Sequence, residues 1–129
     1  MEARKTPSQH TGSHGEDIAA DYLEKKRYKI VHRNYRCRRG EIDIICLDET
    51  ADSGNNVLVF VEVKARRVLD YGAPSESVTT EKIGRMRRAA EVYIMMNGLE
   101  EVCCRFDVVG IVFNRGETQI EHIQDVIDY

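Results

Sequence analysis

The sequence lacks any long uninterrupted run of apolar residues. Its longest such run, Val57 to Val61, is five residues, far short of the ~20 that a helix needs to cross a bilayer. No basic stretch followed by an apolar one opens the sequence, so no secretory signal is predicted. With no membrane span and no secretory signal predicted, we expect a cytoplasmic protein. Internal repeats and low-complexity blocks are also absent.

Cysteine is scarce, and its spacing excludes two classes of small protein. The four cysteines are Cys37, Cys46, Cys103 and Cys104. They form no C-x-x-C pair, and no other ligands stand at chelating distances, so a zinc site is not predicted. A disulfide framework is not expected in a cytosolic chain. We interpret Cys46 and Cys104 as small buried hydrophobic residues.

The sequence also lacks a strong net charge. Its 19 Lys and Arg against 22 Asp and Glu give −3, which argues against a strongly basic, nonspecific nucleic-acid binder. Its 129 residues, 42% hydrophobic and 32% charged, suit one globular domain with one core. We expect a flexible N-terminal tail over 1–12, which is polar and aperiodic, and a single domain over 13–129.

Hydrophobic periodicity predicts seven elements in the order α-β-β-β-α-β-β. Ser13 followed by Glu16 forms a capping-box pattern at the start of the first helix. Thr79 is a candidate N-cap of the second helix, and Gly98 ends it. This order indicates an α/β fold, a single mixed β-sheet flanked by helices. The expected elements are helix 13–27, strands 28–35, 41–47 and 57–64, helix 79–98, and strands 103–113 and 118–123.

Two of these strands are predicted to form a central hairpin. Side chains alternate between the faces of a strand, so one face of the third strand carries only valines. Its other face carries Leu58, Phe60, Glu62 and Lys64. In the second strand, one face carries Ile42, Ile44 and Cys46. The hairpin is apolar on both faces near its loop, which is typical of a strand pair covered on both sides.

The pairing register follows from matching these faces. A shift of one residue would swap every face, so apolar residues stay opposite one another only if paired residue numbers sum to an odd value. The register with a sum of 105 places Asp43 beside Glu62 and Glu41 beside Lys64. Two carboxylates and an amine then share one face at the far end of the hairpin.

This polar cluster favours a metal site. Like charges directly opposite one another destabilise a sheet, and a buried, unpaired carboxylate costs several kcal/mol or takes up a proton. A divalent cation removes both penalties, and carboxylate oxygens are the ligands that Mg²⁺ prefers. We therefore predict that Asp43 and Glu62 bind a metal ion. The alternative is an exposed, salt-bridged sheet edge in which Lys64 neutralises Glu62.

Two further residues are candidate members of the site. Lys64 lies two positions beyond Glu62, roughly 6.5–7 Å along the strand, where its ammonium can orient or deprotonate an attacking water or neutralise a phosphate. Glu16 lies above the apolar stripe of the first helix, from which it can point into the polar end of the sheet. The capping box is the equally weighted alternative for Glu16.

The residues around this cluster resemble a known signature. Gly40 to Ile45, followed after a loop by Val59 to Arg66, is similar to the PD-(D/E)xK nuclease superfamily pattern. More closely, the chain from Gly12 to about Phe113 resembles the YraN-like family of small bacterial proteins. The similarity also includes Gly15-Glu16 with Ala19, Arg33-Asn34, Gly72-Ala73-Pro74 and Lys82.

The resemblance implies a restriction-endonuclease-like fold, similar to that of archaeal Holliday-junction resolvases. It implies that Asp43 and Glu62 are metal ligands, that Lys64 is the catalytic lysine, and that Glu16 is an additional acidic residue. It allows Val63 to contribute a ligand only through its backbone carbonyl.

Basic residues are distributed so that they can form a rim around the acidic centre. Neutralising phosphates in this way would make affinity fall with salt. The alternative is that each basic run is a solvated face, which we prefer for 25–29. The four histidines have no chelating arrangement outside the tail, and we expect them at the surface. The candidate nucleic-acid-binding residues are Arg33, Arg36, Arg66, Lys82 and Arg85.

These patterns together support a Mg²⁺- or Mn²⁺-dependent endonuclease that hydrolyses phosphodiester bonds in DNA, with branched or Holliday-junction-like DNA as a candidate substrate. DNA is expected over RNA, and a homodimer is expected by analogy, because junction cutting needs two sites. Two alternatives remain open. One is a noncatalytic nucleic-acid-binding module with the same fold, and the other is a protein–protein adaptor in which Glu62 and Lys64 form only a salt bridge.

Overall fold

The computed structural model describes residues 7–50, 56–68 and 80–127. Within these ranges, two helices and five strands follow one another in the predicted order α-β-β-β-α-β-β. Within the described residues, neither helix is long and apolar enough to span a membrane. The elements are α1 (Pro7–Lys25), β1 (Tyr28–Cys37), β2 (Gly40–Asp48), β3 (Val57–Arg67), α2 (Thr80–Met96), β4 (Cys104–Asn114) and β5 (Glu117–Ile123).

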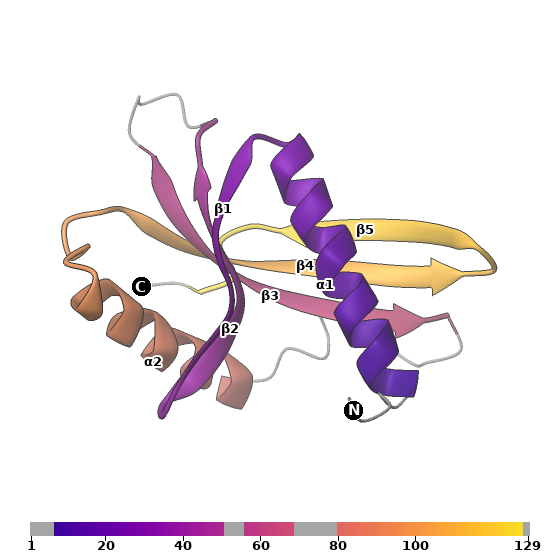
Figure 1. The fold of residues 1–129 in the computed structure, drawn as a ribbon, viewed down its shortest axis with the longest axis horizontal. Helices are drawn as coiled ribbons and strands as arrows, with labels where there is room; N and C mark the ends of the chain where they lie inside the picture. Colours follow the sequence, from indigo (N-terminus) through magenta and orange to yellow (C-terminus); the bar gives the residue numbers. More distant parts are fainter. Residues whose placement is uncertain (1–6, 51–55, 69–79, 128–129) are drawn as a thin grey trace, which may run out of the picture.

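The strands form one mixed sheet in the order β1-β2-β3-β4-β5. β3 and β4 are parallel, and the other three pairings are antiparallel. The parallel pair is connected through α2, since parallel strands need a long crossover. Figure 1 shows α1 crossing one side of the sheet and α2 lying on the other. The prediction of an α/β fold with a single mixed sheet flanked by helices is confirmed.

The first helix begins earlier than the sequence pattern predicts. α1 starts at Pro7, so the helix includes residues 7–12, which the sequence pattern assigned to the tail. Proline is favoured at the first helical position, because its fixed φ suits a helix and its missing N–H has no partner there anyway. Ser13 therefore lies inside the helix and does not cap it, so the predicted capping box is wrong. Residues 1–6 and the predicted N-cap Thr79 lie outside the described residues.

Each face of the sheet carries its own apolar core. The valines of β3 pack with Ala19 and Leu23 of α1. Phe60, on the opposite face, packs with Met86 and other residues of α2. Val59, Phe60 and Val61 are fully buried, so β3 is central and covered on both sides, as its apolar run predicts.

The predicted hairpin register is confirmed over its apolar part, and then the strands separate. β2 and β3 pair with a sum of 105 from Asp48 opposite Val57 to Ile44 opposite Val61. The ladder stops there, so the predicted pairs of Asp43 with Glu62 and of Glu41 with Lys64 do not form. β2 continues with β1 alone and bends away from β3 (Figure 1).

The tip of the β1–β2 hairpin rests on α2. A Cβ at Gly40 would collide with the backbone carbonyl oxygen of Arg85, so this contact requires glycine. The bend carries Ile42 into the core beneath α2, whereas Ile44 packs in the core beneath α1. The prediction that these two isoleucines share a face is therefore wrong, because alternation holds only while a strand stays in one flat sheet.

A buried polar network lies across the sheet from this hairpin tip. Asp107, which is fully buried, accepts two hydrogen bonds from Arg105, at 2.9 and 3.0 Å. His122 lies 2.8 Å from the same carboxylate and is 5% exposed, so the expectation of a surface histidine is wrong here. Arg105 also binds Asp48 and the Tyr28 hydroxyl. Polar groups this deeply buried are tolerated because each has a partner.

Candidate metal and nucleic-acid site

The separation of β2 from β3 creates the candidate site. The Val63 N–H, which would otherwise bind a backbone carbonyl of a neighbouring strand, donates instead to Oδ2 of Asp43 at 2.8 Å. The carboxylate therefore takes the place of the missing ladder bond and is fixed at the fork between the strands. Two neighbouring strands that separate in this way can present carboxylates at a partly buried position.

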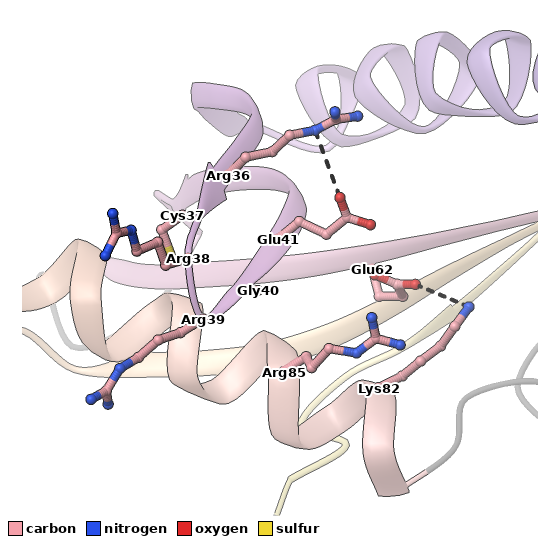
Figure 2. A pocket seen from close by; sticks show the side chains of 9 residues that line it. All are labelled: Arg36, Cys37, Arg38, Arg39, Gly40, Glu41, Glu62, Lys82 and Arg85. Carbon is pink, nitrogen blue, oxygen red and sulfur yellow. Dashed lines mark ion pairs between the residues drawn. The ribbon is translucent and has the colours of Figure 1, made fainter.

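Glu62 and Lys64 extend from the same face of β3 into this fork. The Lys64 ammonium lies 3.4 Å from Oε1 of Glu62, and their side chains are 18% and 15% exposed. Lys82 of α2 reaches the same oxygen at 3.9 Å, as Figure 2 shows. The structure thus brings Asp43, Glu62 and Lys64 together. It also brings the ammonium of Lys82 to Glu62, whereas sequence analysis proposed Lys82 only as a nucleic-acid-binding residue.

The two carboxylates carry unusual proton affinities. Burial raises the pKa of Asp43 to about 6, a rise that the hydrogen bond from Val63 partly offsets and the charge of Glu16 increases. Burial, and then the charge of Asp43, raises the pKa of Glu62 to about 7, against the opposing pull of Lys64. A hydrogen bond between the two carboxylates stabilises the state in which they share one proton.

Glu16 of α1 joins the cluster from the other side. Its charge and hydrogen bonding act on Asp43, and the Asn34 amide, oriented with its nitrogen toward Glu16, donates to both carboxylate oxygens at 3.3 Å. The approach of α1 depends on Gly15, because a Cβ there would collide with the side chain of Ala65. With the capping box excluded, Glu16 belongs to the cluster.

A basic pocket of about 360 Å³ opens beside Glu62. It lies between the tip of the β1–β2 hairpin and α2, and Glu41 pairs across its rim with Arg36 at 3.6 Å. In Figure 2 the side chains of Lys82 and Arg85 point toward Glu62, and those of Arg38 and Arg39 point away from it. Its cationic lining residues are Arg36, Arg38, Arg39, Lys82 and Arg85.

The predicted basic residues divide between two sides of the molecule. Arg36, Lys82 and Arg85 line the pocket. Arg33 instead pairs with Asp17 of α1 at 2.8 Å, and Arg66 follows Lys64 on β3 without lining the pocket. Arg38 and Arg39 also line the pocket, and they are not among the nucleic-acid-binding residues that the sequence predicts. Their position just before Gly40, at a hairpin turn, was the available signal.

The donor set suits a hard divalent cation. Asp43 and Glu62 offer carboxylate oxygens, which Mg²⁺ and Mn²⁺ prefer, and Mg²⁺ commonly keeps several waters in addition to one or two carboxylates. Within the described ranges, no group of three or more His, Cys, Asp or Glu residues is arranged to hold a metal ion. The ligand set that the geometry offers is therefore these two carboxylates, whose mutual repulsion a cation would relieve.

Comparison with known proteins identifies the family. The model of "Uncharacterised protein family UPF0102" matches residues 15–111. A UPF0102 protein of Geobacter metallireducens is 43% identical over 117 residues, which cover 91% of this chain and 91% of that protein.

Further relatives come from distant bacteria. A UPF0102 protein of Prosthecochloris aestuarii is 45% identical over 120 residues, 88% of this chain and 90% of the relative. One from Rhodococcus jostii is 45% identical over 115 residues, 88% and 92% of the two chains. The matched residues include the whole fork from Glu16 to Lys64 as well as α2. The chain therefore belongs to the UPF0102 family, which is the YraN-like family that its sequence resembles.

Proposed function

We propose that the protein is a Mg²⁺- or Mn²⁺-dependent endonuclease of the PD-(D/E)xK superfamily, with a restriction-endonuclease-like fold. Its substrate is DNA rather than RNA, and branched or Holliday-junction-like DNA is the candidate form. The observation that carries this proposal is the convergence of Asp43, Glu62 and Lys64 at the fork between β2 and β3.

Asp43 and Glu62 would hold the divalent cation. When bound, such an ion supplies Lewis-acid stabilisation of charge on phosphate oxygens and lowers the pKa of water. Asp43 is positioned for this role, because the Val63 N–H fixes one of its oxygens and its carboxyl group interacts with Glu62. The pKa values of about 6 and 7 mean that the acids are ready to exchange their shared proton for a cation near neutral pH.

Lys64 supplies a fixed positive charge beside the reacting phosphate. Its ion pair with Glu62 orients the ammonium, and its low exposure strengthens its field. It stabilises negative charge as it develops on the phosphate and orients the water that attacks. Glu16, which accepts hydrogen bonds from Asn34, raises the pKa of Asp43 through its charge and its hydrogen bonding. Its role in the site is therefore exerted through Asp43.

The test is cleavage of defined DNA by the purified protein. Linear duplex, single-stranded and four-way DNA are incubated with Mn²⁺ or with EDTA, beside Glu62→Gln and Lys64→Ala. We expect Mn²⁺-dependent products from the wild type and at least a hundred-fold less from either variant, since catalytic groups of this kind contribute ~10²–10⁴-fold. Lys29→Ala, an exposed change on β1, is the matched control. Products that persist equally in all variants would refute the mechanism.

A noncatalytic nucleic-acid-binding module is the second candidate. The observation in its favour is the basic pocket, which can hold phosphate without any metal. Binding of DNA in EDTA with no turnover in Mg²⁺ or Mn²⁺ would select this candidate. A titration of Mn²⁺ into the protein separates the nuclease from an adaptor, because only the nuclease requires a metal site.

We also propose that the protein is cytoplasmic and that it acts on junctions as a homodimer. All four cysteines are free thiols, which agrees with a reducing compartment. Two active sites are needed for paired cuts, and sedimentation of the protein with and without four-way DNA tests this part.

A further inference from the structure

The surface around the fork is divided by charge. On the α1 side, Asp17, Asp21 and Glu24 are exposed on one helix, and two of them already pair with Arg33 and Lys25. On the α2 side, the hairpin tip and the first turns of α2 carry five cations around the pocket. The α2 side of the fork therefore offers a polyanion more positive charge than the α1 side does.

Several of these cations have no acidic partner. Within the residues that the structure describes, Arg38, Arg39 and Arg85 form no ion pair, and all three are exposed. Arg36 and Lys82, by contrast, each lie near a glutamate. Unpaired, exposed guanidinium groups beside a carboxylate site are suited to phosphate, which arginine binds in a bidentate geometry.

The lining of the pocket also indicates which form of nucleic acid fits. Among the described residues, the nine that line the pocket include no aromatic side chain. Proteins that bind single strands stack unpaired bases on aromatic side chains, whereas contacts to a duplex backbone need only cations and polar groups. The pocket therefore matches the phosphates of a duplex rather than splayed bases.

Resting on the proposed function, we propose that Arg38, Arg39 and Arg85 form a phosphate track for the backbone of duplex DNA. The duplex lies across the tip of the β1–β2 hairpin and the start of α2, and it leaves the α1 face uncovered. Arg85 contacts the phosphate nearest to the carboxylates. Arg38 and Arg39, which point to the other side of the hairpin in Figure 2, contact phosphates farther along. This binding needs no metal.

The track is tested by DNA-binding affinity in EDTA, measured by fluorescence anisotropy over a range of KCl concentrations. The probes are a short blunt duplex and its single strand. The variants are Arg38→Ala/Arg39→Ala and Arg85→Ala, and the matched control is Lys26→Ala/Lys29→Ala, which removes two exposed cations at the opposite end of β1.

We expect the wild type to bind the duplex more tightly than the single strand. Loss of both hairpin arginines should reduce the slope of log K against log salt by about 1.8, because each phosphate contact contributes ~0.9. Arg85→Ala should reduce it by about half as much, and the control should bind like the wild type.

Equal losses in the control, unchanged binding by the arginine variants, or tighter binding of the single strand would overturn the track. Cleavage in Mn²⁺ is measured in parallel and separates the two proposals. Cleavage that survives with unchanged binding refutes only the track, whereas arginine-dependent duplex binding without cleavage refutes only the nuclease.

Discussion

Asp43 and Glu62 make the fork costly for the folded protein when no metal is bound. The pKa of each carboxyl is higher in the folded chain, about 6 and about 7, than the ordinary values of ~3.9 and ~4.3 in an unfolded chain. Between these limits the folded state binds more protons than the unfolded state, so stability falls as the pH rises. The two carboxyl groups stabilise the folded state below about pH 4, and this stabilisation is lost as the pH rises through about 6 to 7.

Removing one of these charges should therefore stabilise the metal-free protein. Asp43→Asn keeps an oxygen that accepts the Val63 N–H but carries no charge. We expect its free energy of unfolding at pH 8 in EDTA to exceed that of the wild type by about 1–3 kcal/mol, shrinking toward zero at pH 4. Urea denaturation at both pH values measures this, with Glu24→Gln as a surface control. A variant less stable than the wild type at pH 8 would contradict it.

A divalent cation should reverse the same penalty. We expect Mn²⁺ to raise the melting temperature of the wild type at pH 8, with a gain of ~2.7 kcal/mol at a hundred times the dissociation constant. The gain should diminish at pH 5, because protons compete for the shared carboxylates. Asp43→Asn should show little shift at either pH, and EDTA should abolish the effect. An equal shift in this variant would show that Mn²⁺ binds elsewhere.

At the scale of elements, two helical glycines have opposite roles. A Cβ at Gly15 of α1 would collide with Ala65 of β3, whereas one at Gly84 of α2 would meet only the mobile end of the Arg88 side chain, at 3.2 Å. The first glycine sets the distance between a helix and the sheet. The second only weakens a helix.

Alanine at each glycine should therefore change stability in opposite directions. Gly84→Ala should raise the free energy of unfolding by about 0.5–1 kcal/mol, the ordinary cost of glycine in a helix. Gly15→Ala should lower it by about 1–3 kcal/mol through overpacking, and should displace Glu16 from the fork. Thermal unfolding of both variants measures this, and stabilisation by Gly15→Ala would show that α1 moves away freely.

Sequence analysis predicted most of the fold, because local patterns determine it. Hydrophobic periodicity was enough to give the element order, and alternation along β3 with its apolar match to β2 gave the register of the hairpin. It failed where tertiary structure overrides the pattern. Ile42 changes face because its strand leaves the sheet, and the helix starts at Pro7 because proline suits its first turn. His122 is buried because Asp107, distant in sequence, lies beside it.

The candidate site was predictable in its residues but not in its construction. Asp43, Glu62 and Lys64 stand out as polar groups next to apolar strands. Their expected geometry, a direct ladder pair, was wrong, because Asp43 binds the Val63 N–H only where the ladder has ended. The contacts of Lys82 and Glu16 depend on how both helices pack, which no pattern within one element contains.

At the scale of the whole molecule, Arg105 and Asp107 of β4 connect the sheet through side chains, because they also bind Tyr28 of β1, Asp48 of β2 and His122 of β5. Burial opposes ionisation of Asp107, yet hydrogen bonds from His122 and Arg105 hold its pKa below the ordinary value. The Tyr28 hydroxyl, bound by Arg105 and Gln124, links the first strand to the chain after the last.

Removing one partner of the Arg105–Asp107 pair should lower the free energy of unfolding more than replacing both partners with apolar residues. Arg105→Met leaves the buried Asp107 carboxylate without its guanidinium partner, and we expect a loss of about 3–5 kcal/mol in the free energy of unfolding. Arg105→Met/Asp107→Leu removes both charges and should lose less. Urea denaturation compares them, with the exposed Arg88→Met as a control. A double variant that is less stable than the single one would show that the pair itself is strongly favourable.

The contact between Gly40 and the Arg85 carbonyl has a consequence for the proposed DNA binding. The backbone of the hairpin tip packs directly against the backbone of α2 there, so the two elements cannot separate without losing this contact. This wall of the basic pocket is thus held in place before any ligand binds, and little ordering entropy is lost when the proposed duplex binds. We therefore expect a crosslink that clamps the hairpin tip to α2 to change duplex binding little.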